Sequence, residues 1–191
     1  MKLSEHVEHI RQLTDSAFRN RLGRMGINSI RLTSIEEIPN EYCEDRRRIE
    51  PILDVFVDET GTFAQAFEKL VEELTFTLFN RLAALKVMEA HVLHPEIVTK
   101  REANGGRSFA HLAWLENNPQ ARSVEAEGLI PFIEGQFSKL SNDIPLFSMD
   151  HPYHLLPTAL EFLGIVNAFN DVEKDGQVDT DIWKSDDDWR Y

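Results

Sequence analysis

The sequence has a single cysteine, no long apolar run and no excess of positive charge. Because Cys43 is alone among 191 residues, no disulfide can form within the chain, which is typical of proteins in a reducing compartment. No stretch approaches the roughly 18 consecutive apolar residues that a membrane span requires, and the charged N-terminus lacks the apolar segment of a secretory signal. These absences predict a cytoplasmic location.

Positive charge is scarce, since 20 Lys and Arg face 33 Asp and Glu and the net charge is −13. This balance disfavours a protein whose main task is to hold the phosphate backbone. Residues 1–48 carry 9 basic and 8 acidic side chains, whereas residues 49–191 carry 11 and 25. Any contact with DNA or with a partner is therefore expected at Arg46, Arg47 and Arg48, with a solvated helix face paired to neighbouring acids as the alternative.

Catalytic and metal-binding signatures are also missing, so the sequence predicts no catalytic and no metal-ligating residue. It contains no glycine-rich phosphate loop, dinucleotide fingerprint, HExxH motif or nucleophile elbow. The sequence has three histidine pairs at i,i+3 spacing, and His91/His94 and His151/His154 lack the nearby Cys or carboxylate set that would complete a metal site. The pairs are His6/His9, His91/His94 and His151/His154.

One acidic segment has the spacing of a calcium-binding loop. Asp171–Ile182 follows the EF-hand pattern at most positions, but its twelfth residue is Ile182 in place of the bidentate glutamate. We therefore expect a solvated acidic linker there, with calcium binding as the alternative.

What the sequence does contain is helical periodicity. Apolar residues recur every three or four positions over about residues 5–22 and, most clearly, over residues 63–91. Pro51 and Pro131 are expected to interrupt or restart two of the remaining helices. Those helices are expected over residues 41–58, 109–116, 125–140 and 158–169. No segment alternates apolar and polar residues, so the predicted fold is mainly α: an irregular helical bundle around one long central helix, with long loops and no substantial sheet.

The chain length allows one domain, or one domain with an extension, at about 150 residues per domain. We expect an N-terminal helical part over 1–58, a helical core over 59–169 and an acidic linker over 170–191. The linker holds 8 acidic and 3 basic side chains, yet Trp183, Trp189 and Tyr191 crowd its last nine positions. Such large apolar groups at an end indicate that the polypeptide is cut from a longer one.

The segment Leu74–Glu89 resembles a recurrent segment near the N-terminus of large bacterial adenine-specific DNA methyltransferases. These are the PglX-type methylases of BREX phage-defence systems and related restriction-modification methylase subunits. There the run reads approximately aromatic-Asn-Arg-Leu-x-Ala-x-Arg/Lys-x-Met-Glu. The matching residues here are Phe79, Asn80, Arg81, Leu82, Ala84, Lys86, Met88 and Glu89. The closing stretch, Asp181–Tyr191, is similar to the family's approach to its catalytic core.

The resemblance implies a non-catalytic N-terminal helical module of a larger S-adenosylmethionine-dependent adenine methyltransferase of a phage-defence or restriction-modification system. Such enzymes bind the cofactor with a glycine-containing turn and hold adenine with an Asn-Pro-Pro-aromatic motif. Here the nearest approach is Asn118-Pro119-Gln120, so neither catalytic nor cofactor-binding residues are expected in this chain. The implied partners are a missing C-terminal methyltransferase domain, other defence-system proteins and, through the full-length enzyme, DNA, with no membrane.

Asn80 and Arg81 interrupt an otherwise apolar turn of the long helix. A buried polar side chain needs a hydrogen-bond partner, and no acid lies three or four positions from Arg81. We therefore expect a partner from another element, such as Glu161 or Asp150, and a structural role, with contact to a partner domain or DNA as the alternative. Two other functions stay open for the whole chain: a stand-alone acidic, DNA-mimicking protein-binding module, and a calcium-binding helical protein.

Overall fold

The computed structural model describes residues 3–171, 173–174, 177–178 and 180–184. Over these residues the chain folds into six α-helices, and its strands form only two antiparallel hairpins of two-residue strands. The predicted mainly α fold around one long helix is therefore confirmed. A helix long and apolar enough to cross a bilayer is not found among the described residues.

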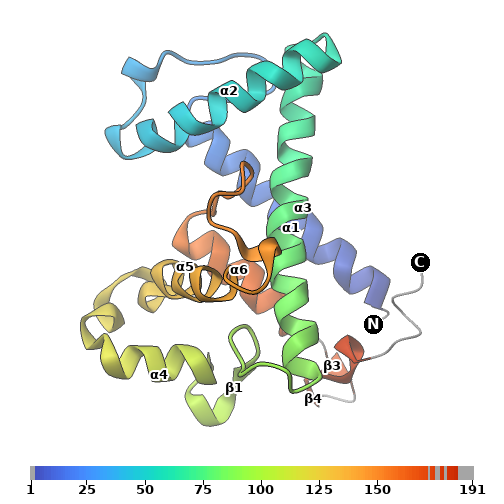
Figure 1. The fold of residues 1–191 in the computed structure, drawn as a ribbon, viewed down its shortest axis with the longest axis vertical. Helices are drawn as coiled ribbons and strands as arrows, with labels where there is room; N and C mark the ends of the chain where they lie inside the picture. Colours follow the sequence, from blue (N-terminus) through green and yellow to red (C-terminus); the bar gives the residue numbers. More distant parts are fainter. Residues whose placement is uncertain (1–2, 172, 175–176, 179, 185–191) are drawn as a thin grey trace.

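The long helix α3 (Phe63–Ala90) is the axis on which the other helices pack (Figure 1). It begins where predicted, because the Thr62 side chain accepts a hydrogen bond from the Gln65 N–H and caps the first turn. At about 1.5 Å per residue α3 is about 40 Å long. The leucine stripe of α3 is buried, and its members are Leu70, Leu74, Leu78, Leu82 and Leu85.

Two N-terminal helices cover α3. They are α1 (Leu3–Arg24) and α2 (Cys43–Thr60), and the segment between them contains an isolated antiparallel bridge between Ile27 and Leu32. Contrary to the sequence-based expectation, α2 runs unbroken through Pro51. Pro51 lies on the exposed side of α2, where water can satisfy the carbonyl that loses its N–H donor.

The C-terminal half adds three shorter helices, which lie beside the lower half of α3 in Figure 1: α4 (Phe109–Asn117), α5 (Leu129–Leu140) and α6 (Ala159–Ala168). The hairpin of β1 (Lys100–Arg101) and β2 (Arg107–Ser108) precedes α4, and that of β3 (Glu173–Lys174) and β4 (Gln177–Val178) follows α6. Short 3-10 turns complete the described chain at Ile35–Glu37, Asn40–Tyr42, Glu102–Asn104, Pro119–Ser123, Glu125–Gly128, Pro145–Phe147 and Thr180–Trp183.

One hydrophobic core joins these elements, from Leu3 on α1 to Trp183 in the last 3-10 turn. Trp183 is buried between His6 and Phe169, at ring-centroid distances of 5.8 and 5.4 Å. The stretch expected to be a solvated linker therefore returns to the core at this point. Trp189, Tyr191 and several positions of the calcium-loop-like segment lie outside the described residues.

Candidate functional site

Arg81 is buried in the middle of α3 and holds the loop between α5 and α6. Its Nε donates to the Leu146 carbonyl at 2.8 Å and its Nη2 to the Ser148 carbonyl at 2.6 Å. Nη1 donates to Nδ1 of His154 at 2.7 Å, and the guanidinium carbon lies 5.3 Å from the centre of the Phe137 ring. Each guanidinium nitrogen thus has a partner, so Arg81 fixes this loop on the long helix.

Burial and the Arg81–His154 contact together determine the protonation states of these two side chains. A guanidinium can only donate, so Nδ1 of His154 accepts and the imidazole proton sits on Nε2. Burial, followed by the nearby charge of Arg81, lowers the pKa of His154 to about 4. Burial also lowers the pKa of Arg81, to about 10, which leaves it charged at neutral pH. The contact therefore joins a cation to a neutral imidazole.

The predicted partners of Arg81 are corrected by this geometry. Glu161 instead completes the capping box of α6 with Thr158 and accepts hydrogen bonds from Asn20 and Arg24 at 3.1 and 3.0 Å. Asp150 is exposed. Arg81 instead binds two backbone carbonyls and one imidazole of the loop that covers it. Asn80 is only partly buried, which corrects the expectation of a buried amide.

Glu89 and Lys86 hold a second loop, at the C-terminal end of α3. Glu89 Oε1 accepts the N–H groups of Ile97 and Val98, both at 2.8 Å, and Oε2 accepts that of Thr99 at 2.9 Å. The carboxylate thereby satisfies three buried backbone donors that have no strand partner. Lys86 is only 3 % exposed and donates to Thr99 Oγ1 at 2.6 Å. Sequence reasoning gave Lys86 and Glu89 no role, although both stand out as charges close to the apolar stripe.

The three predicted contact arginines differ in exposure. Arg46 is 1 % exposed, and its guanidinium donates to the carbonyls of Met25 and Thr33 at 2.6 and 3.1 Å and to Glu50 at 3.0 Å. The prediction that Arg46 contacts DNA or a partner is therefore corrected, since the chain itself uses its donors. Arg47 is exposed and remains a candidate.

Arg48 is exposed as well, but it approaches Asp45 at 3.4 Å on the same helix. Asp45 also pairs with Arg21 of α1 at 2.6 Å. This arrangement matches the alternative of a solvated helix face paired to neighbouring acids. Only Arg47 and Arg48 of the predicted set face solvent.

Metal ligands are not assembled in the part of the chain that the structure describes, where no group of three His, Cys, Asp or Glu is placed to hold an ion. His151 Nδ1 accepts the N–H of Tyr153, and its predicted pair partner His154 is bound to Arg81. Ile182, at the glutamate position of the EF-hand-like segment, is buried in the core.

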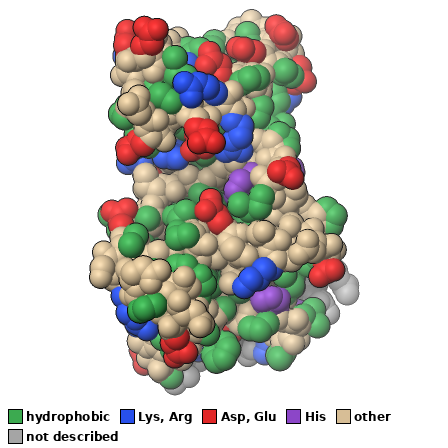
Figure 2. Space-filling view, turned by 60° about the vertical axis from the view of Figure 1, so that its left-hand side comes forward, with side chains coloured by type: hydrophobic (Ala, Val, Ile, Leu, Met, Phe, Trp, Pro, Cys, Tyr) green, Lys and Arg blue, Asp and Glu red, His purple; other side chains and the backbone are tan. Residues whose placement is uncertain are grey.

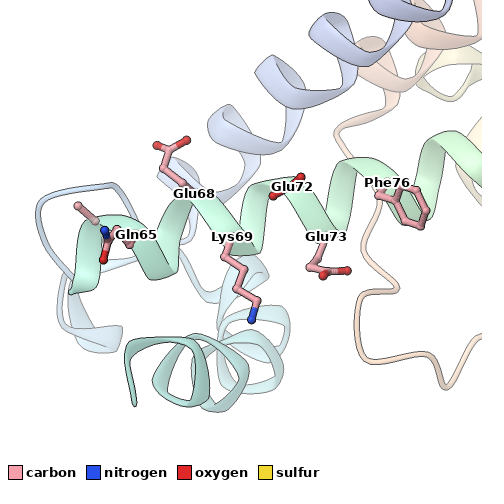
Figure 3. A pocket seen from close by; sticks show the side chains of 7 residues that line it. Gln65, Glu68, Lys69, Glu72, Glu73 and Phe76 are labelled. Atoms are coloured by element: carbon pink, nitrogen blue, oxygen red, sulfur yellow. The ribbon is translucent and has the colours of Figure 1, made fainter. Parts of the chain in front are cut away.

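An acidic strip, formed by Glu68, Glu72 and Glu73, runs along the first half of α3. Figure 3 shows these side chains together with their neighbours from Gln65 to Phe76. The strip forms a hollow of about 710 Å³, but all of its lining residues belong to α3, so it is a shallow surface. Glu68 pairs with Arg19 at 2.6 Å, and Lys69 pairs with Glu59. Figure 2 shows acidic and basic side chains interspersed on the face in view, not a continuous acidic field.

A second hollow, of about 490 Å³, opens where α3 ends. Lys86, Glu89 and Thr99 form part of its wall, together with Arg101 of β1 and Trp183. It is lined by several elements, unlike the acidic strip. We found no match between this chain and any family model, curated protein or solved structure, so the resemblance of Leu74–Glu89 to methylases rests on its residues alone.

Proposed function

We propose that this chain is a non-catalytic helical module of a larger S-adenosylmethionine-dependent adenine-specific DNA methyltransferase, in which it serves as a scaffold and docking domain. One observation carries the proposal: the charged residues shared with the methylase segment bind the chain's own loops. Arg81 holds the loop before α6, and Glu89 with Lys86 holds the loop after α3. The shared charged residues thus stabilise the fold of this chain, and this supports a scaffold role.

The one partial match to an adenine-binding motif also has a structural use. The Asn118 side chain donates to the Trp114 carbonyl at 2.9 Å and so closes the end of α4. Pro119 then begins the next 3-10 turn. This supports placing the catalytic chemistry, and the cofactor S-adenosylmethionine, in another domain of the parent enzyme.

The DNA-mimic alternative has weaker support. A mimic needs exposed carboxylates without counterions, spaced like phosphates. Several acids are neutralised by arginine instead, including Glu68 by Arg19 and Glu127 by Arg107, both at 2.6 Å. The scaffold proposal accounts for these pairs as ion pairs that connect secondary-structure elements of the fold.

The reading frame and the gene product test the proposal together. We expect the frame to continue past Tyr191 into an Asn-Pro-Pro-aromatic motif, and the purified product to methylate adenine in DNA. Arg81→Met should lower the amount of folded, active enzyme, whereas Arg11→Met, which removes an exposed arginine from α1, should leave it unchanged. A stop codon directly after Tyr191 would refute the proposal.

A further inference from the structure

The hollow at the end of α3 is lined by several elements of the fold. Its volume of about 490 Å³ lies in the range of small-molecule sites. Its walls come from α3, from the loop and strand after it, from the start of α4 and from the turn that carries Trp183. Segments distant in sequence thus meet around one space.

The cavity wall contains a buried ammonium group that does not use all of its hydrogen-bond donors. Lys86 Nζ has three N–H donors and gives one of them to the neutral Thr99 hydroxyl. Its acidic neighbour Glu89 already accepts three backbone N–H groups. None of the ion pairs formed by the described residues includes Lys86. A buried cation in this state is stabilised by an anion that enters the cavity.

The other groups around Lys86 leave room for such an anion. Arg101 of β1 lines the cavity and pairs with Glu96, so these two charges balance each other. His94 also lines it. Burial, followed by the nearby charges of His9 and Lys86, lowers the pKa of His6 of α1 to about 4 and keeps it neutral. Glu89 and Glu96 offset part of the charge of Lys86, and the two Nζ donors that Thr99 does not use are left for a ligand.

Two residues of the cavity lining stand out, an exposed aromatic ring and a valine with a left-handed backbone. Phe109, the first residue of α4, lines the cavity and is 60 % exposed. Val92, also in the lining, is 88 % exposed and has φ of 58°, a left-handed conformation that a β-branched side chain rarely adopts. An exposed aromatic ring and a strained backbone at a cavity mouth are features of ligand-binding loops.

We propose that this cavity binds a small organic anion, a phosphate or carboxylate attached to a flat ring, with the anionic group on Lys86 and the ring against Phe109. Nothing in this assignment depends on the methyltransferase proposal, because each of the groups belongs to this chain. The two anion types share the chemistry that Lys86 recognises, and the experiment separates them.

Proton uptake gives a signature specific to this site. Burial lowers the pKa of Lys86 to about 8, and the negative charges of Glu89 and Glu96 offset only part of this effect while Arg101 adds to it. An anion placed beside Nζ raises that pKa again. At pH 9 most of the unliganded protein has a neutral Lys86, so binding there takes up a proton, whereas binding at pH 6.5 does not.

Isothermal titration calorimetry of the whole chain tests the proposal with three probes: phenyl phosphate, benzoate and inorganic phosphate. We expect one of the two ring-bearing anions to bind at least tenfold more tightly than inorganic phosphate. Lys86→Met should weaken that binding at least tenfold, and the matched control Lys139→Met, an exposed lysine on α5, should change it less than twofold. Phe109→Ala should weaken binding of the ring-bearing probe and leave the affinity for inorganic phosphate unchanged.

Titrations at pH 9 in two buffers of different ionisation enthalpy measure the proton uptake on the unmodified protein, so the test stands even if Lys86→Met fails to fold. Uptake approaching one proton per bound probe is the expected result. Absence of binding by both ring-bearing probes, binding without proton uptake, or equal affinity in a folded Lys86→Met variant would each overturn the proposal.

Discussion

Two adjacent arginines on α2 should respond in opposite ways to the same substitution. Arg46 is buried and bound to the backbone between α1 and α2, whereas its neighbour Arg47 is exposed. Arg46→Ala and Arg47→Ala remove the same atoms from successive positions of one helix. The pair therefore separates the effect of burial from that of charge and helix propensity.

The expected magnitude follows from the contacts of Arg46. Its removal leaves the Met25 and Thr33 carbonyls without a donor, and Met25 is fully buried. An unsatisfied buried acceptor costs about 1–3 kcal/mol, and Glu50, which is partly exposed, can regain water. We therefore expect Arg46→Ala to lower the free energy of unfolding by about 3 kcal/mol. Arg47→Ala should change it by less than about 0.5 kcal/mol, as is usual for an exposed site.

Urea unfolding followed by circular dichroism at 222 nm measures both variants. A domain of this size typically has a stability of about 5–15 kcal/mol, so a loss of about 3 kcal/mol moves the midpoint clearly. Equal midpoints for the two variants would show that the buried guanidinium contributes nothing and would refute the reasoning. A loss confined to Arg47→Ala would reverse the assignment of the two residues.

Four further predictions follow from the same structure. In the proposed parent enzyme, Arg47→Ala with Arg48→Ala should weaken DNA binding about equally on all sequences and reduce the slope of log affinity against log salt by about 2; an unchanged slope would assign both residues to a solvated face. The pKa of His154 lies near 4 in the folded chain against an ordinary 6.5, so the unfolded chain takes the proton first and stability should fall as pH drops from 6.5 to 4. His154→Asn, whose side-chain oxygen can still accept from Arg81, should flatten that fall in thermal melts. Val92→Gly should raise stability by about 1 kcal/mol in urea, because it relieves a left-handed valine at an exposed position. The isolated chain should not bind S-adenosylmethionine, and calorimetry that shows micromolar affinity would contradict this.

The fold was predictable where local signals and packing agree. The leucine stripe and the Thr62 cap placed α3 within one residue of its observed end at Ala90. Pro51 was misread because a proline signals an interruption only where the lost hydrogen bond cannot be replaced, and exposure cannot be read from the proline itself.

The turn before α5 shows a feature that sequence alone could not reveal. Ala126 and Glu127 both have φ of 51°, a conformation that usually requires glycine. Contacts with distant residues hold it: Arg107 donates twice to the Glu127 carboxylate, at 2.7 and 2.6 Å, and His111 Nε2 donates to the Glu127 carbonyl at 3.0 Å. These contacts exist only once β2 and α4 are in place, so no local pattern predicts the turn.

The arginine run was wrong as a site prediction at one of its members, Arg46. Three consecutive arginines on a helix point in three directions about 100° apart, so at least one of them must face away from any single partner. On α2 that residue is Arg46, which turns toward the Met25 and Thr33 carbonyls. The run alone does not identify which member is turned inward, but the helical spacing of Arg46 from the buried Ile49, Leu53 and Phe56 does.

The buried charges of α3 follow one rule, and its exception locates the proposed ligand site. Loops without secondary structure leave backbone groups that must find partners. The cation Arg81 serves the carbonyls of one loop, and the anion Glu89 serves the N–H groups of another. Lys86 departs from this rule, since its one hydrogen bond in the described chain goes to a neutral hydroxyl and it lies in a cavity wall. The anion site proposed above therefore lies at the Nζ donors of Lys86 that the described chain does not use.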